Sequence, residues 1–279
     1  MSRWKAFFCS MLITLFCLLP LYLLVVGGQL FGVQAVDETV GGIPVLTPGE
    51  NDRLTLLLVV DSPVPAAALV RLDAWQRRAE LLVLPGSTLL PAQDGRVTLQ
   101  ECLSDAGPLQ LRLALETALG AKTERYLCLS VDALVELFRE YSPLMDWEEL
   151  GNIRDLALLR RFAFNGGEGV VSSGTAAALV RGNEDGDAAA AQLRAALYRA
   201  FLTEALPTLA APATALLRSD AELLTDISAV DIYGVERLLT LLGQDPPAVA
   251  AGVPEGIAVR EGWQLTDAGW DALRALLTD

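Results

Sequence analysis

The sequence contains no histidine among its 279 residues. This absence excludes histidine-based acid-base catalysis, Ser-His-Asp triads and metal sites with histidine ligands. Its four cysteines include no Cys-x-x-Cys pair, which excludes a zinc ribbon and a thioredoxin-type redox site. Two of them, Cys102 and Cys128, lie in the part expected to be soluble. These two either pair with each other or pack as small buried side chains.

Basic residues are also scarce, with 21 Lys and Arg against 35 Asp and Glu and a formal net charge of −14. Binding to nucleic acid depends on a basic face that neutralises phosphates, so no nucleic-acid partner is expected. The same balance gives no general attraction to anionic lipid. Hydrophobic residues make up 52% of the chain, which is enough for a sizeable folded core.

A long uncharged run occupies the N-terminal end of the chain. No charged residue occurs from residue 6 to residue 36, and the stretch AFFCSMLITLFCLLPLYLLVVGG is rich in Leu, Phe and Val. About 20 apolar residues in a helix cross a bilayer core of about 30 Å. We therefore predict a transmembrane anchor at residues 6–28. The alternative is a cleaved signal peptide, for which Val33-Gln34-Ala35 has the pattern of a cleavage site.

The charges on the two sides of this run predict its orientation. Arg3 and Lys5 precede it, and Asp37 and Glu38 are the first charges after it. By the positive-inside rule, residues 1–5 form a cytoplasmic tail and the remainder lies outside the cytoplasm. The predicted localisation is the cell membrane, with a single pass and an extracytoplasmic C-terminal domain.

Strand and helix patterns alternate along the rest of the chain. Residues 29–52 end in a stretch rich in Gly, Pro and acidic residues and predict a linker. The apolar run Leu54–Val60 is typical of a strand buried on both faces, and the two runs around Trp75-Gln76-Arg77-Arg78 predict a hairpin. Helices are predicted from Gly107-Pro108 to Gly120 and over residues 187–206, 213–224 and 229–242.

This interleaving predicts an α/β fold, namely an α/β/α layered domain with a central mixed sheet, over residues 53–243. The segment QDPPAVAAGVPEG then has the composition of a second linker-like run. It is followed by a strand pattern in GIAVREGWQL and a terminal helix pattern. We expect residues 244–279 to form a strand-helix extension that packs on the same domain.

Five segments of the chain resemble the LytR-CpsA-Psr family. LTLLLVVDS, which ends at Asp61-Ser62, resembles the family's first core strand with its LLLGxDS ending, and LVRLDAWQRRAELLVLPGS resembles the hairpin after it. TLQECLSDAGPLQLRLALETALG and RYLCLSVDALVELFREY are similar to the units that follow. VVSSGTAAALVRGNEDGDAAAAQLRAAL resembles the family pattern HLNGEQALAYVRxRxxDxDxGRxxRQ. The similarity covers most of residues 50–242.

The resemblance implies a membrane helix followed by an extracytoplasmic α/β/α domain. It also implies an activity, because family members move anionic glycopolymers such as teichoic acid from a polyprenyl-pyrophosphate carrier to peptidoglycan. In the family, arginines grip the pyrophosphate and carboxylates hold a divalent metal. Both neutralise charge that builds up on the leaving group. Mg²⁺ is therefore expected as a cofactor only if the family's site is retained.

The chain departs from the family at most of its arginine positions. Val64-Pro65-Ala66 stands where the family has RSD, and Pro85-Gly86-Ser87 stands where it has PRD. The two arginines of GRxxRQ correspond to Ala188 and Ala191, and the second arginine of VRxR corresponds to Asn183. We therefore expect that the fold is kept and that the transferase site is lost or badly weakened.

Three polar matches to the family survive. Asp61 and Arg181 are the candidate catalytic residues, and Asp61 and Asp185 are the candidate metal ligands. Each also has a structural interpretation. Asp61 would cap a turn at a strand end, Arg181 would interact with a helix dipole or form a surface salt bridge, and Asp185 would belong to a solvated acidic turn.

Three functions follow from these patterns. The first is a catalytically degenerate envelope protein that acts in cell-wall glycopolymer attachment as a scaffold or polyprenyl-lipid-binding module. The second is an active phosphotransferase with a rebuilt site, and the third is an unrelated membrane-tethered interaction domain. The expected partners are the membrane and a polyprenyl-linked glycan or cell-wall polymer. The candidate residues of a rebuilt site are Asp61, Arg181, Asp185, Arg71, Arg77, Arg78 and Arg194.

Overall fold

The computed structural model of the chain describes residues 38–40, 43–61, 65–92, 95–130, 132–134, 145–146, 170–171, 188–219 and 223–278. The chain divides into two compact units, residues 1–49 and residues 50–279. In the first unit the described residues form a hairpin of β1 (Glu38–Val40) and β2 (Ile43–Val45), which falls inside the predicted linker.

The anchor predicted at residues 6–28 lies outside the described residues. Among the residues that are described, no single helix has the length and apolar character needed to cross a membrane. One sharply bent pair of helices, Ala190–Ala205 with Ala210–Arg218, meets both conditions when its two parts are taken together.

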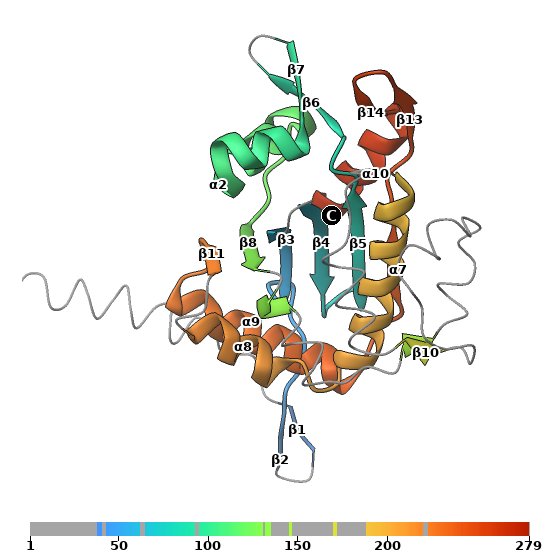
Figure 1. Cartoon of the computed structure of the whole chain (residues 1–279). Helices are drawn as coiled ribbons and strands as arrows, with labels where there is room; N and C mark the ends of the chain where they lie inside the picture. The colour runs from blue at the N-terminus through green and yellow to red at the C-terminus, as the bar shows by residue number, and fades with distance from the viewer. Residues whose placement is uncertain are drawn as a thin grey trace, which may run out of the picture. The chain divides into compact units, whose positions relative to one another are not determined.

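A six-stranded mixed sheet forms the centre of the second unit (Figure 1), in the order β11-β8-β3-β4-β5-β12. β8 runs parallel to β3, and β12 runs parallel to β5. β4 is antiparallel to both β3 and β5, and β11 is antiparallel to β8. The predicted α/β class with a central mixed sheet is confirmed. The strands are β3 (Arg53–Asp61), β4 (Ala66–Asp73), β5 (Arg78–Leu84), β8 (Arg125–Ser130), β11 (Leu223–Thr225) and β12 (Val249–Gly252).

One face of this sheet is covered by helices α2 (Leu99–Leu119) and α10 (Asp267–Leu277). Leu57 and Val59 of β3 share one hydrophobic core with Leu115 of α2 and Leu273 of α10. Successive residues of a strand point to opposite faces, so the residues of β3 that share this face are every second one. Asp61 follows Leu57 and Val59 at that spacing, which places it on the α2 face.

The opposite face is buried as well. Val60, Val70 and Val83 are buried but lie outside the core described above, so they belong to the second face. Helix α7 (Ala188–Ala205) contacts β5 and β12, and helix α9 (Ala229–Gln244) contacts β4. Because both faces are covered, the central strands carry near-continuous apolar runs, as in Leu54–Val60.

Local signals explain the ends of α2. Thr98 and Glu101 form a capping box at its start, and Gly120 ends it in the left-handed region with a φ of 66°. Gly107 is not helical, with a φ of 78° and a ψ of 177°, so it divides α2 into two helical segments at a kink. The second segment begins after Gly107, as predicted, and the first segment, from Leu99, was not predicted. The capping box marks the beginning of the first segment, and the Gly-Pro pair marks the beginning of the second.

The C-terminal residues extend the second unit. β13 (Gly256–Val259) and β14 (Gly262–Leu265) form a hairpin, and Thr266 then caps α10 by accepting a hydrogen bond from Gly269 N. The strand pattern in this region therefore corresponds to a hairpin and not to one strand. The remaining elements are β6 (Leu89–Ala92), β7 (Gly95–Thr98), β9 (Met145–Asp146), β10 (Val170–Val171) and α8 (Ala210–Arg218).

Candidate functional site

Asp61 ends β3 and pairs with Ser130, the last residue of the parallel strand β8. Ligands of open α/β sheets bind at the carboxyl ends of parallel strands, so this edge is the place where the family resemblance predicts a site. The Asp61 side chain is exposed. Burial, together with the negative charge of Asp61, raises the pKa of the Cys128 thiol to about 11. The carboxylate of Asp61 is therefore close enough to the buried Cys128 thiol of β8 to act on it electrostatically.

The other two surviving matches, Arg181 and Asp185, lie outside the described residues. Their positions relative to Asp61 are therefore not part of the described structure. Among the residues that it does describe, no group of three or more Cys, Asp and Glu side chains forms a metal-binding cluster. Mg²⁺ binds one or two carboxylates together with substrate phosphates, so Asp61 fits a single position of such a site.

Backbone hydrogen bonds hold the turn that replaces the family's PRD segment. Pro85 O accepts a hydrogen bond from Thr88 N at 2.9 Å, and Gly86 O accepts one from Gln100 N at 2.9 Å. Ser87 O accepts one from Trp263 N at 2.8 Å. The turn thus attaches the start of α2 and the β13–β14 hairpin to the end of β5. It presents no guanidinium group, because Gly86 has no side chain.

The helix that matches the family's GRxxRQ segment is α7. Ala191 is buried with 1% of its surface exposed and packs as part of the apolar core. An alanine at this position contributes volume to the core and no charge. The arginine contacts that the family makes from this helix are therefore missing at Ala188 and Ala191.

Three of the arginines considered for a rebuilt site lie at the wrong end of the sheet. Arg71 lies opposite Thr55 on β3, and six residues of extended strand separate Thr55 from Asp61, or about 20 Å. Arg71 is only 2% exposed and donates to Asp73 Oδ2 at 3.2 Å and to the carbonyl of Thr278. Arg77 lies in the turn between β4 and β5, and Arg78 begins β5 opposite Asp73, so both are still further from Asp61 than Arg71 is. These three arginines do not converge with Asp61.

Arg194 is placed differently, on α7. It is 3% exposed, and Tyr198, one helical turn further on, is 5% exposed. Within the described part of the chain, the Tyr198 hydroxyl has no hydrogen-bond partner. Burial raises the pKa of Tyr198 to about 12, although the nearby Arg194 charge opposes this shift. Tyr198 was not predicted from the sequence, and its i, i+4 spacing from Arg194 is the signal that would have found it.

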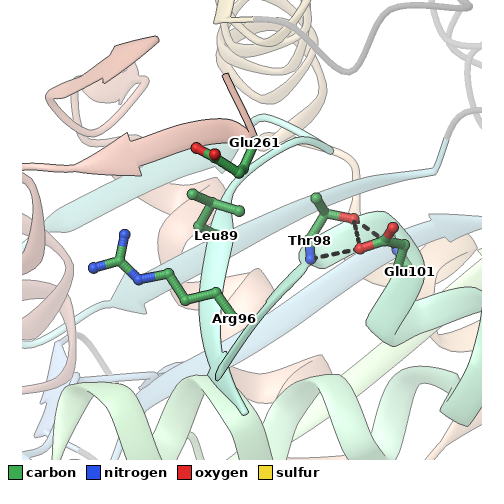
Figure 2. A pocket seen from close by; sticks show the side chains of 5 residues that line it. All are labelled: Leu89, Arg96, Thr98, Glu101 and Glu261. Atoms are coloured by element: carbon green, nitrogen blue, oxygen red, sulfur yellow. Dashed lines mark hydrogen bonds between the residues drawn. The ribbon is translucent and has the colours of Figure 1, made fainter. Parts of the chain in front are cut away.

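A separate surface pocket of about 440 Å³ lies beside the start of α2 (Figure 2). It is lined by Leu89, Arg96, Thr98, Glu101 and Glu261. Glu101 is turned toward Thr98 and accepts hydrogen bonds from Thr98 N at 2.9 Å and Oγ1 at 2.8 Å, which lower the pKa of Glu101. Arg96 donates to Gln264 at 3.0 Å. Arg96, Thr98 and Glu101 already form hydrogen bonds within the protein, and Asp61 does not line the pocket.

The structure also decides between the two alternatives for the cysteines described in the second unit. Cys102 and Cys128 are free and buried. Of the two alternatives left by the sequence, packing as small apolar side chains is confirmed. Cys102 and Cys128 both belong to the core on the α2 face of the sheet.

Solved structures share this fold. TagT from Bacillus subtilis, an enzyme of the LytR-CpsA-Psr family, superposes with a TM-score of 0.58 and 14% identity, covering 86% of this chain and 95% of that chain. TagT bound to LIIa-WTA gives a TM-score of 0.60 and 12% identity, covering 84% and 93%. A transcription regulator from Eubacterium siraeum gives 0.61 and 12%, covering 86% and 96%. No family model matches the sequence, and no curated protein matches it.

The chain thus has the α/β/α fold of a class of proteins that includes a LytR-CpsA-Psr enzyme of cell-wall glycopolymer chemistry. At these identities the likeness shows the fold and leaves the activity to be argued from the site.

Proposed function

We propose that this chain is a membrane-anchored, extracytoplasmic protein of the bacterial cell envelope that acts in cell-wall glycopolymer attachment without catalysing transfer. Its second unit would bind a polyprenyl-linked glycan or serve as a scaffold for its attachment. Residues 6–28 would anchor the chain in the cell membrane, with residues 1–5 in the cytoplasm.

The proposed partner is supported by the relatives of the fold. TagT has been solved bound to LI-WTA and to LIIa-WTA, which are lipid-linked wall teichoic acid precursors. The present chain buries leucine- and alanine-rich helices against both faces of its sheet. An apolar interior of this kind is suited to a long isoprenoid chain, which gains free energy by leaving water.

The proposed loss of catalysis rests on one observation, the chemistry at the positions of the family's arginines. Gly86 and Ala191 offer no charge, and Arg71, Arg77 and Arg78 lie at the far end of the sheet from Asp61. A charge-assisted hydrogen bond contributes about 1.5–3 kcal/mol. Several such bonds would supply most of the stabilisation of the charge that develops on a pyrophosphate as its P–O–P bond breaks and polyprenyl phosphate leaves, so their loss removes the main catalytic term.

The experiment uses the full chain reconstituted in lipid nanodiscs, with geranylgeranyl pyrophosphate and Mg²⁺. Two quantities are measured, the lipid retained on the protein and the phosphate or pyrophosphate released into solution. We expect retention of the lipid with no release above a protein-free control. Release that disappears in Asp61→Ala but persists in Asp105→Ala, an exposed carboxylate on α2, would show instead that the protein is an active transferase.

A second candidate function, the active phosphotransferase, is favoured by the buried pair on α7. Arg194 supplies a guanidinium on the helix that matches the family's arginine segment, and Tyr198 supplies a buried hydroxyl with no hydrogen-bond partner among the described residues. Arg194→Lys keeps the charge and Arg194→Gln removes it. If the second candidate holds, turnover falls in Arg194→Gln and is partly restored in Arg194→Lys, while the melting temperatures of the two variants agree.

A further inference from the structure

The turn between β4 and β5 carries an exposed tryptophan beside two arginines. Trp75 is 54% exposed, and the side chains of Arg77 and Arg78 are 62% and 36% exposed. Tryptophan combines an apolar ring with one polar N–H and is enriched where membranes meet water. Arginine adds a planar donor group that matches phosphate oxygens. The turn thus combines the two side-chain types that suit a phospholipid headgroup layer.

The base of this turn is buried and firmly held. Asp73 is 1% exposed, and its Oδ1 accepts a hydrogen bond from Gln76 N at 2.7 Å. Arg71 donates to Asp73 Oδ2 at 3.2 Å from within the core. Arg77 adopts the left-handed region with a φ of 54°, which is uncommon outside glycine. The Trp75 side chain therefore projects from a fixed support and not from a loose loop.

The same turn lies where the chain from the N-terminal unit joins the sheet. Ala74 N, next to Trp75, donates to Asp52 O at 2.9 Å, and Asp52 directly precedes β3. Asp61 is at the other end of β3. The chain therefore leaves the second unit, toward residue 49, at the end of the sheet that carries Trp75 and not at the end that carries Asp61.

We propose that Trp75, Arg77 and Arg78 contact the phospholipid headgroup layer of the membrane in which the chain is anchored. This inference rests on the anchor that forms part of the proposed function. The net charge of −14 opposes attraction to anionic lipid, so the contact depends on the tryptophan ring and on individual lipid phosphates. Arg77 forms an exposed ion pair with Asp245, and such a pair exchanges readily for another anion. Arg78 is held by two hydrogen bonds to Glu80 in a partly buried pair, so Arg77 is the one that can exchange its partner for a lipid phosphate.

This contact would orient the domain. β3 is nine residues long, so with the Trp75 end on the bilayer the Asp61 edge would stand about 25 Å further out. A glycan held near Asp61 would then face the cell wall. A lipid chain attached to it would have to extend along the sheet to reach the membrane.

The test measures fluorescence quenching by lipids that carry a doxyl quencher, in phosphatidylcholine vesicles containing the full chain. The emission of Trp75→Phe is subtracted from that of the wild type, which leaves the contribution of Trp75. A matched control places a new tryptophan by Ile257→Trp in the Trp75→Phe background. Ile257 is also 54% exposed, but it lies on β13, whose hairpin is bonded to Ser87 beyond the far end of β5.

We expect doxyl lipid to reduce the Trp75 contribution and to leave the Ile257→Trp contribution unchanged. Equal quenching of both, or of neither, overturns the inference. Flotation of the vesicles is measured in parallel. A chain that floats with the vesicles but shows no quenching of Trp75 contradicts this contact alone, whereas a chain that does not float contradicts the anchor as well. Neither result changes the phosphate-release assay, which tests the proposed loss of catalysis separately.

Discussion

Trp263 N donates a hydrogen bond of 2.8 Å to the carbonyl of Ser87, and this bond fastens the C-terminal hairpin to the turn that replaces the family's PRD segment. The neighbouring Gly262 makes the approach feasible. Its φ is 150°, and a Cβ atom there would lie 2.3 Å from Ser87 O. A segment that would hold catalytic arginine in the family is therefore committed here to joining two parts of the fold.

We expect Gly262→Ala to destabilise the domain by more than about 2 kcal/mol, because it adds both backbone strain and a collision with Ser87 O. Gly95→Ala is the matched control. Gly95 also has a positive φ, 133°, but a Cβ there would meet nothing within 4 Å. Strain alone should cost about 1–2 kcal/mol at Gly95, measured by urea unfolding followed by circular dichroism. Equal losses in the two variants would contradict the close approach to Ser87.

We expect Arg71→Met to cost about 3–5 kcal/mol, because it leaves the Asp73 carboxylate buried without its charged partner. Both side chains of this pair are only 2% exposed. Arg77→Met is the control, since the Arg77–Asp245 pair is 62% and 63% exposed and should contribute less than about 1 kcal/mol. Urea unfolding of the two variants gives the comparison. An Arg71→Met protein no less stable than Arg77→Met would contradict the buried ion pair.

The stability of the domain should fall with acid in a way that depends on Asp231. Hydrogen bonds from Arg125, and further ones from Ser228, hold the pKa of Asp231 at about 2, below its ordinary value of 3.8. A carboxyl whose pKa is lowered on folding stabilises the protein above its unfolded pKa, and this contribution is lost as the pH falls through the folded value. The loss should therefore run from about pH 4 to about pH 2.

Asp231→Asn should remove this acid-dependent contribution. Because the carboxylate is partly exposed, we expect a loss of about 1 kcal/mol at neutral pH, and less as the pH approaches 2. Melting temperatures of the wild type and the variant across this range give the measurement, with Asp105→Asn as a control. Parallel curves with no convergence in acid would mean that Asp231 does not carry the effect.

The thiol of Cys128 should report the position of Asp61. Burial, and then the charge of Asp61, raises the pKa of Cys128 to about 11, so the thiol stays protonated and unreactive near pH 8. Asp61→Asn should lower this pKa and speed alkylation of Cys128 at high pH, as followed by mass spectrometry of the modified peptide. Cys102, whose pKa is raised by burial and by Asp105, should respond to Asp105→Asn instead. A Cys128 rate that is indifferent to Asp61→Asn would contradict their proximity.

Some elements were predictable because they carry their own signal. The apolar run before Asp61 and the two runs around Trp75 appear as β3 and the β4–β5 hairpin, and Leu54–Val60 is a central strand as expected. Others were missed because pairing alone makes them strands. β12 lies in the Pro- and Gly-rich segment predicted to be a linker, and it becomes a strand by parallel pairing with β5. β11 overlaps the last two residues of the helix predicted over 213–224, yet it pairs with β8 as an edge strand.

The candidate site divides in the same way. Asp61 could be placed at a strand end from the pattern of LTLLLVVDS, and β3 does end there. Arg194 was a candidate from the sequence, but the pattern did not show that it and Tyr198 are both buried on α7. Whether a polar side chain in such a helix is buried depends on what covers it, which is a property of distant segments.

Composition and local order were sufficient to settle several features of this protein. They excluded histidine chemistry, predicted the alternation of strands and helices, and marked the positions where arginines of the family are replaced. The tertiary structure decided where the remaining arginines go. Arg71 is only ten residues from Asp61 in the chain, but the antiparallel pairing of β4 with β3 carries it back along the sheet, to a position opposite Thr55. The register of a strand is set by its pairing with the neighbouring strands. The distance between Arg71 and Asp61 therefore follows from the assembled sheet and not from the sequence alone.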